Sequence, residues 1–173
     1  MINIKRIHII GSVGSGKTTL SRKLSKEYVI PHYELDNVVW KREKSGDIRR
    51  TIEERDQQLT EIVTQEKWII EGVHDKWVLP SFKHADIIIF LDTPKRIRTA
   101  RIIKRFVKQL LKVEKANYKP SWNMFLQMFK WNNQFEEKNK FEILQTLKPF
   151  EDKLIILNNE VDLEEVINSN YKK

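Results

Sequence analysis

The chain has 173 residues and a formal net charge of +8 at pH 7, with 32 Lys and Arg against 24 Asp and Glu; this length suits a single domain, which we expect over residues 1–173. It contains no Cys, which excludes disulfide bonds and thiolate metal sites. No apolar run approaches the roughly 18 residues of a membrane helix, and the start, MINIKRIHII, is too short for a signal peptide, so we expect a cytoplasmic protein with no membrane partner.

The first predicted strand, Lys5–Ile10, leads directly into the sequence GSVGSGKT, which is a P-loop motif. Its glycines allow tight turning, so several backbone N–H groups can converge on the oxygens of a nucleoside triphosphate. In such a loop Lys17 bridges the β and γ phosphates, and the Thr18 hydroxyl ligates Mg²⁺. A helix predicted over Lys17–Tyr28 points the positive end of its dipole at the same anions. The residues predicted to bind the nucleotide are Gly11, Ser12, Gly14, Ser15, Gly16, Lys17, Thr18 and Thr19.

A second strand is predicted at His32–Leu35, and Asp36 follows it at the carboxyl edge, where open α/β sheets bind ligands. There Asp36 can hold a phosphoryl acceptor or accept a proton from its hydroxyl. An equally supported alternative is that Asp36 caps the next helix. Trp40 can stack on a flat acceptor or belong to the core. The next helix is expected at about residues 51–65, and its apolar face comprises Ile52, Leu59, Ile62 and Val63.

The third predicted strand, Trp68–Glu71, ends in a carboxylate at the same edge of the sheet. Beside the P-loop, Glu71 can hold the hydration shell of Mg²⁺; the alternative is a solvated strand end. Gly72 would let the substrate approach the backbone. His74 and Asp75 can contact an acceptor, although a surface His needs no such role. A fourth strand is predicted at Ile87–Leu91.

Thr93 and Pro94 resemble an N-cap and a first-turn proline, so a long helix is predicted from there to about residue 115. Five basic side chains share one face of this helix: Arg98, Arg101, Arg105, Lys108 and Lys112. Guanidinium groups grip phosphate oxygens bidentately, so Arg101 and Arg105 are predicted to stabilise the transferring phosphoryl group. The alternative is a solvated basic face.

A long insertion separates the fourth strand from the fifth, which is predicted at Leu154–Leu157. We expect residues of about 105–145 to form a helical lid, with a packing stripe of Trp122, Phe125, Leu126 and Phe129. The same aromatic and basic stretch, from Tyr118 to Phe135, can alternatively form a stacking platform for single-stranded nucleic acid. A last helix is expected after Asp162.

The alternation of strands and helices predicts an α/β protein with a three-layer P-loop NTPase fold. We expect a five-stranded parallel sheet, with the helical lid inserted between the fourth and fifth strands.

Four segments together resemble the adenylate kinase-like small P-loop kinases: GSVGSGKT, LDNVVW, WIIEG and IIIFLDTPKRIRTARIIKR. The resemblance is closer to the DNA topology modulation (FlaR-like) proteins; it covers residues 3 to about 112 and resumes at KLIIL. In the wider family the carboxylate that ends the third strand lies by the metal, and an Arg-x-x-x-Arg pair begins the lid. The resemblance therefore implies these roles for Glu71, and for Arg101 with Arg105.

The chain departs from the FlaR-like pattern in the lid, where arginines usually follow the aromatic segment. Here no Arg follows Arg105, and the region carries Asn132, Asn133, Lys138 and Lys140. Lysines cannot reproduce a bidentate guanidinium fork.

These features predict an ATP- and Mg²⁺-dependent phosphotransferase of the nucleotide or nucleoside kinase type. Its predicted catalytic residues are Lys17, Asp36, Arg101 and Arg105, and its metal ligands are Thr18 and Glu71. The expected partners are a nucleoside triphosphate and a small phosphoryl acceptor. The alternative is a nucleotide-controlled, nucleic-acid-binding regulator of DNA topology with little or no kinase activity, which the net positive charge would also suit.

Overall fold

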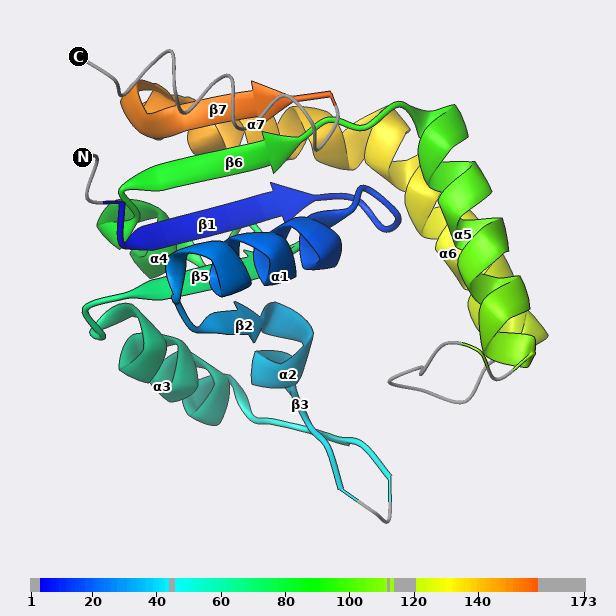
Figure 1. Cartoon of the computed structure of the whole chain (residues 1–173), viewed down its shortest axis with the longest axis horizontal. Coiled ribbons are helices and arrows are strands. Elements are labelled where there is room, and N and C mark those ends of the chain that lie inside the picture. The colour runs from blue at the N-terminus through cyan, green and yellow to red at the C-terminus, as the bar shows by residue number, and fades with distance from the viewer. Residues whose placement is uncertain (1–3, 44–45, 112, 114–120, 159–173) are drawn as a thin grey trace.

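The computed structural model describes residues 4–43, 46–111, 113 and 121–158 (Figure 1). Five strands form one sheet: β1 (Arg6–Gly11), β2 (His32–Glu34), β5 (Trp68–Gly72), β6 (Ile87–Leu91) and β7 (Leu154–Leu157). Their order is β2-β5-β1-β6-β7, and every neighbouring pair is parallel. The predicted α/β fold with a five-stranded parallel sheet is confirmed. No helix in the described part of the chain has the length and apolar character needed to cross a membrane.

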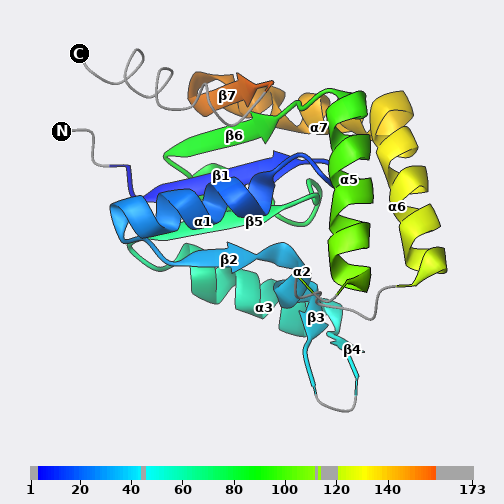
Figure 2. The same ribbon diagram turned by 45° about the vertical axis from the view of Figure 1, so that its right-hand side comes forward.

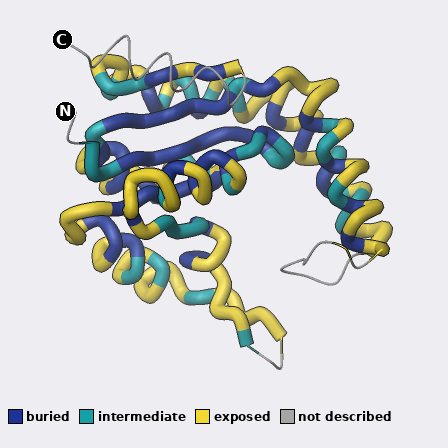
Figure 3. The backbone as a smooth tube through the Cα atoms, viewed as in Figure 1, coloured by how far each residue is buried: buried dark blue, intermediate teal, exposed yellow. Residues whose placement is uncertain are grey.

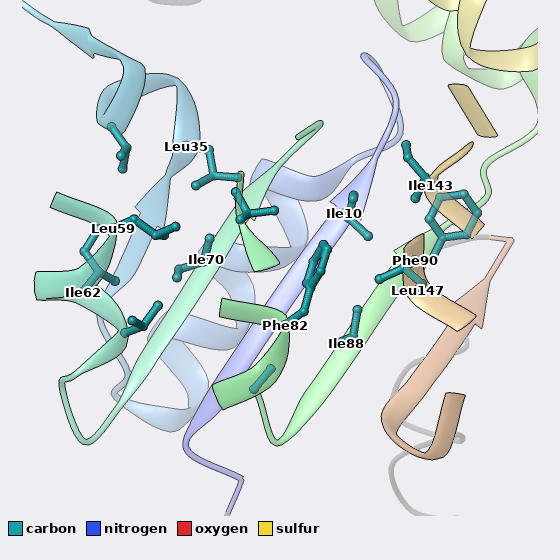
Figure 4. Packing of buried hydrophobic residues seen from close by; sticks show 14 of the residues in the cluster. Ile10, Leu35, Leu59, Ile62, Ile70, Phe82, Ile88, Phe90, Ile143 and Leu147 are labelled. Atoms are coloured by element: carbon teal, nitrogen blue, oxygen red, sulfur yellow. The ribbon is translucent and has the colours of Figure 1, made fainter. Parts of the chain in front are cut away.

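Helices cover both faces of the sheet, because successive strand side chains point to opposite sides. On one face α1 (Lys17–Tyr28) packs Leu20 and Leu24 against the strands. The opposite face carries α3 (Ile52–Val63), α4 (Leu79–His84) and α7 (Lys140–Leu147). Figure 4 shows the core on this second face; its labelled residues are Ile10, Leu35, Leu59, Ile62, Ile70, Phe82, Ile88, Phe90, Ile143 and Leu147.

Helix α3 begins as its sequence predicts. The Thr51 hydroxyl accepts from the backbone N–H of Glu54, and the Glu54 carboxylate accepts from the backbone N–H of Thr51, which completes a capping box. Leu59, Ile62 and Val63 are buried as expected. Ile52 is 63% exposed and does not belong to the buried face, because it lies at the first turn beyond the sheet-covering part of the helix.

A one-turn helix, a two-stranded ribbon and a second short helix between β2 and β6 were not predicted. Leu35 begins a one-turn helix, α2 (Leu35–Val39), instead of ending the second strand. It leads into a two-stranded antiparallel ribbon of β3 (Trp40–Lys41) and β4 (Ile48–Arg49), which projects from the body below α2 (Figure 2). Figure 3 shows the ribbon largely exposed. Helix α4 is the third element, and elements this short carry too few residues for a periodic pattern.

Between β6 and β7 the chain forms helices that extend beyond the sheet. They are α5 (Lys95–Leu110), α6 (Trp122–Gln134), the π-helix η1 (Phe135–Asn139), α7 and the 3₁₀ helix η2 (Lys148–Lys153). Pro94, not Thr93, is the N-cap of α5, and α5 ends at Leu110 rather than near residue 115. Lys112, Tyr118 and the helix expected after Asp162 lie outside the described residues.

Helices α5 and α6 pack side by side through aromatic rings (Figure 2). The rings of Phe106 and Phe125 stack with centroids 4.3 Å apart, and Phe125 meets Phe129 edge to face at 4.9 Å. Of the predicted packing stripe, Phe125 and Phe129 are half-buried, whereas Trp122 and Leu126 are exposed. The buried residues of α6 are therefore Met128 and Asn132, and not the four residues of the predicted stripe.

Candidate active site

The P-loop lies at the carboxyl end of β1, the central strand of the sheet. Gly14 and Gly16 have φ values of 73° and 101°, a region that other residues rarely adopt. Gly16 is also the N-cap of α1, so the helix begins at the lysine of the motif. The loop therefore has the strand–turn–helix context that a phosphate-binding P-loop requires.

Two side chains of the motif point inward and are held by hydrogen bonds. Lys17 is buried, and its Nζ donates to the carbonyl oxygen of Ser12 at 2.8 Å. The Thr18 hydroxyl donates to Glu71 Oε1 at 2.6 Å, across α1 and β5. Glu71 is itself buried at the end of β5. The structure thus brings together the predicted phosphate-binding lysine and the two predicted metal ligands.

Burial and nearby opposite charges shift the pKa values of Lys17 and Glu71 in opposite directions. Desolvation lowers the pKa of Lys17, and the carboxylates of Glu71 and Asp36 oppose that change. Desolvation also raises the pKa of Glu71, against the effects of Lys17 and of the Thr18 hydrogen bond. A phosphate anion beside Lys17 would favour its charged form, so the buried ammonium suits an anionic ligand.

Hydroxyl and carboxylate oxygens are the ligands that Mg²⁺ prefers, and it usually completes its shell with water and substrate phosphates. Thr18 and Glu71 supply such a pair. Within the described residues no group of three or more His, Cys, Asp and Glu side chains is arranged to hold a metal ion. A metal here would therefore depend on phosphate oxygens as further ligands.

Asp36 is exposed in the first turn of α2. The N-cap of this helix is Glu34, so the alternative that Asp36 caps the helix is wrong. The Asp36 carboxylate acts on the pKa values of Lys17, Glu71 and His74. It is therefore close enough to act electrostatically on Lys17 of the P-loop, on Glu71 of β5 and on His74 in the loop after β5.

The other residues considered as possible acceptor contacts have their own surroundings in the structure. A Cβ on Gly72 would lie 2.6 Å from Leu35 Cδ1, so the missing side chain makes room for α2 and not for a substrate. Asp75 accepts a hydrogen bond from Thr146 at 3.2 Å. His74 is half-buried, with its ring 5.2 Å from that of Trp77. Trp40 is 37% exposed and does not belong to the core.

The two arginines predicted to bind phosphate lie near the P-loop. The Nη1 atom of Arg101 donates to the carbonyl oxygen of Ser15 at 2.8 Å. Nη2 of Arg105 lies 3.3 Å from the sulfur of Met128, and its charge contributes to the lowered pKa of Lys17. In this conformation Arg101 supports the loop backbone.

Arg98 is fully buried, and its guanidinium is held by contacts inside the protein. Its guanidinium donates to Asn132 Oδ1 at 2.7 Å, to the carbonyl oxygen of Thr93 at 3.1 Å, and to Glu136 Oε2 at 2.5 Å. It also lies 4.7 Å from the ring of Phe135. The predicted basic face is therefore divided, because α6 and η1 cover the part that carries Arg98.

Residues that stand where the FlaR-like pattern has lid arginines make internal contacts. The Asn132 amide donates to Thr99 and accepts from Arg98, and Lys140 forms a 2.7 Å ion pair with Asp92.

Sequence reasoning missed the role of Thr93, whose hydroxyl donates to the Ser15 carbonyl at 2.9 Å. Its position two residues after the fourth strand, which pairs with the P-loop strand, was the available signal. Reasoning also missed Arg55, which lies 4.5 Å from the ring centroid of Trp77. No sequence pattern predicts this contact between α3 and the loop after β5.

The comparisons with known proteins concern both sequence and fold. Residues 7–115 match the AAA domain family (AAA_18). The chain is 35% identical over 105 residues to the uncharacterized protein YqaC of Bacillus subtilis (strain 168), an alignment that covers 58% of this chain and 56% of that protein. It is 31% identical over 111 residues to a cytidylate kinase of Pyrococcus horikoshii, and this alignment covers 57% of the chain and 56% of that protein. The chain thus spans little more than half the length of these curated relatives.

Solved structures share the fold along nearly the whole chain. A shikimate kinase from Acinetobacter baumannii in complex with shikimate gives a TM-score of 0.53 at 19% identity, covering 99% of this chain and 97% of that one. An uncharacterized protein from Eubacterium ventriosum gives a TM-score of 0.54 at 14% identity, and the match covers 97% of this chain and 98% of that one. These identities show the fold alone, and the FlaR-like subgroup remains a prediction. With its P-loop on the central strand and its match over residues 7–115, the chain belongs to the AAA domain family (AAA_18) and has the fold of P-loop kinases.

Proposed function

We propose that the protein is an ATP- and Mg²⁺-dependent phosphotransferase of the nucleotide or nucleoside kinase type. The observation that carries this proposal is the buried Lys17 ammonium inside the P-loop, next to the Thr18–Glu71 hydroxyl–carboxylate pair. The likeness of the chain to a cytidylate kinase and a shikimate kinase supports the same reaction class. Loss of the Lys17 charge should therefore remove the donor site.

In this reaction the P-loop backbone and Lys17 hold the β and γ phosphates of ATP. Thr18 and Glu71 would hold Mg²⁺, which supplies charge compensation to the phosphate oxygens when bound. We assign to Asp36 the orientation of the acceptor hydroxyl or the acceptance of its proton, because its carboxylate acts electrostatically on Lys17. Catalysis then depends mainly on positioning and electrostatic stabilisation.

Arg101 and Arg105 lie on α5, where Arg101 donates a hydrogen bond to the P-loop backbone and the charge of Arg105 acts on Lys17. We propose that residues of about 105–145 close over the phosphates as a lid and exclude water. Closure would free Arg101 from the Ser15 carbonyl to bind a phosphate oxygen, which a guanidinium binds more strongly than a neutral carbonyl.

The nucleic-acid-binding alternative has less support. Its basic helix and aromatic platform are largely used inside the protein, since Arg98 is buried and Phe125 stacks on Phe106. The relatives with kinase names also favour a small acceptor.

Lys17→Ala tests the donor site. We expect ATP-dependent phosphoryl transfer to fall below detection in a screen of nucleosides, nucleoside monophosphates and small alcohols, while circular dichroism shows that the variant still folds. Lys26→Ala is the matched control, because Lys26 lies on the same helix and is exposed. Full activity in a folded Lys17→Ala protein would contradict the proposal.

A further inference from the structure

The carbonyl oxygen of Ser15 in the P-loop accepts two hydrogen bonds from side chains that follow β6. The Thr93 hydroxyl donates to it at 2.9 Å, and Nη1 of Arg101 donates to it at 2.8 Å. Ser15 itself is fully buried. Because a buried carbonyl without a donor is unfavourable, these two side chains fix the direction in which the Ser15 carbonyl points.

The direction of the Ser15 carbonyl also sets the direction of the Gly16 N–H, because both groups belong to one peptide plane. The described chain contains no cis peptide bond, so this carbonyl and this N–H point to opposite sides. The N–H therefore points away from Thr93 and Arg101. Within the described residues it has no hydrogen-bond acceptor, since Gly16 is the N-cap of α1. It is thus an available donor in the loop that binds phosphate.

Thr93 is the more firmly held of the two donors to Ser15. It is 1% exposed, and its own carbonyl oxygen accepts from Nη1 of the fully buried Arg98 at 3.1 Å. Arg101, by contrast, is half-buried and reaches the Ser15 carbonyl with a long side chain, which the proposed closure transfers to a phosphate oxygen. After closure the Thr93 hydroxyl is the donor that remains on the Ser15 carbonyl.

We infer that Thr93 is a positioning residue of the nucleotide site: its hydroxyl orients the Ser15–Gly16 peptide so that the Gly16 N–H donates to a phosphate oxygen of the bound triphosphate. A hydrogen bond to the carbonyl also polarises the peptide group, which makes its N–H a stronger donor. The inference rests on the proposed function for the identity of the ligand as a nucleoside triphosphate. Thr93 acts through the loop backbone and not through contact with the ligand.

Binding of a triphosphate to the full chain tests the inference. The probe is a non-hydrolysable ATP analogue with Mg²⁺, and calorimetry measures its dissociation constant. Thr93→Val removes the hydroxyl but keeps the branched shape, and it should weaken binding about tenfold, because Arg101 then leaves an unsatisfied carbonyl when it moves to the phosphate. Thr93→Ser keeps the hydroxyl, so its dissociation constant should stay within about twofold of the wild-type value.

Thr64→Val is the matched control. The Thr64 hydroxyl also donates to a backbone carbonyl, that of Thr60 at 3.0 Å, but it lies at the end of α3, which covers the opposite face of the sheet from α1. Its loss should change the dissociation constant less than about twofold. Urea unfolding of the three variants separates an effect on the loop from an effect on the fold, because a folded protein of lower stability keeps the affinity of its site.

The Gly16 N–H can be observed directly by NMR in isotope-labelled protein. Its amide proton should move downfield when the analogue binds, since a hydrogen bond to a charged phosphate oxygen deshields it. The shift should be smaller in Thr93→Val, and it should keep its full size in Thr93→Ser and Thr64→Val.

Wild-type affinity in Thr93→Val, an equal loss of affinity in Thr93→Ser, or a full Gly16 shift in Thr93→Val would each overturn the inference. A wild-type protein that does not bind the analogue would contradict both the inference and the proposed function. Binding that depends on the Thr93 hydroxyl, without phosphoryl transfer to any acceptor, would support the inference and contradict the proposed function. The two hypotheses are therefore distinguishable.

Discussion

Asp36 and Lys17 lie in very different surroundings although their charges interact. Lys17 is buried inside the loop and bonded to Ser12, whereas Asp36 is exposed on α2. An exposed carboxylate gains little from a distant charge and contributes little to folding. Asp36 is therefore free to be replaced without loss of the fold, which makes its proposed role testable by kinetics alone.

Asp36→Asn should lower the rate of phosphoryl transfer about 100-fold while ATP affinity changes little, because an amide cannot accept the acceptor's proton. Steady-state kinetics with the identified acceptor and calorimetry with an ATP analogue measure the two effects. Asp152→Asn, an exposed substitution on η2, should leave both unchanged. A parallel loss of ATP affinity and rate would assign Asp36 to another role.

Three arginines on one face of helix α5 make three different kinds of contact. Arg98 is buried by α6 and η1, Arg101 bonds to the P-loop backbone, and Arg105 lies against Met128. The 3,4 spacing places all three on one broad face. Their separate roles arise because different neighbours cover different parts of that face.

Replacing Arg98 by Met should destabilise the protein by about 3 kcal/mol, since it removes three hydrogen bonds and leaves Glu136 without its partner. Urea unfolding measures the change. Glu136→Gln should cost less, because the side chain of Glu136 is 38% exposed and Arg98 keeps its other two acceptors. Arg96→Met, on the same helix and exposed, is the control; an equal effect of Arg96→Met and Arg98→Met would contradict a buried network.

The central strand of the sheet carries a fully buried ionisable side chain. His8 on β1 is fully buried, with Nδ1 2.8 Å from the Ser81 hydroxyl and no hydrogen-bond partner for Nε2 among the described residues. The Ser81 hydroxyl donates to the Val78 carbonyl, so it accepts from Nδ1–H of a neutral imidazole. Desolvation lowers the pKa of His8 from 6.5 to about 3.

Acid should therefore weaken the whole fold through His8. Below pH 6.5 the unfolded chain binds a proton that the folded chain does not, so stability present above this pH is lost as the pH falls toward about 3. Between pH 7 and pH 5 the loss from His8 is about 2 kcal/mol. Urea unfolding at both pH values should show a correspondingly smaller drop in His8→Leu, which leaves the Ser81 hydroxyl bonded to Val78. An NMR titration of His8 near pH 6.5 would refute the expectation.

The order of strands and helices could be predicted because the information is local. The apolar runs of β1, β5, β6 and β7 and the capping box at Thr51 each depend on a few adjacent residues. The P-loop motif likewise specifies its own turn, and its position after β1 follows. Parallel pairing then brings the carboxyl ends of β1 and β5 together, so Glu71 near Thr18 was also foreseeable.

Contacts between distant segments could not be derived from the sequence. Gly72 faces Leu35, Arg98 faces Glu136, and the Arg49 guanidinium lies 5.9 Å from the Trp40 ring centroid across a ribbon too short to give a pattern. Each contact depends on how two elements pack, and periodicity identifies the face of a helix or strand without identifying what covers it. The sequence was therefore sufficient for the P-loop and the sheet, whereas the division of the basic helix and the surroundings of Asp36 follow from tertiary packing.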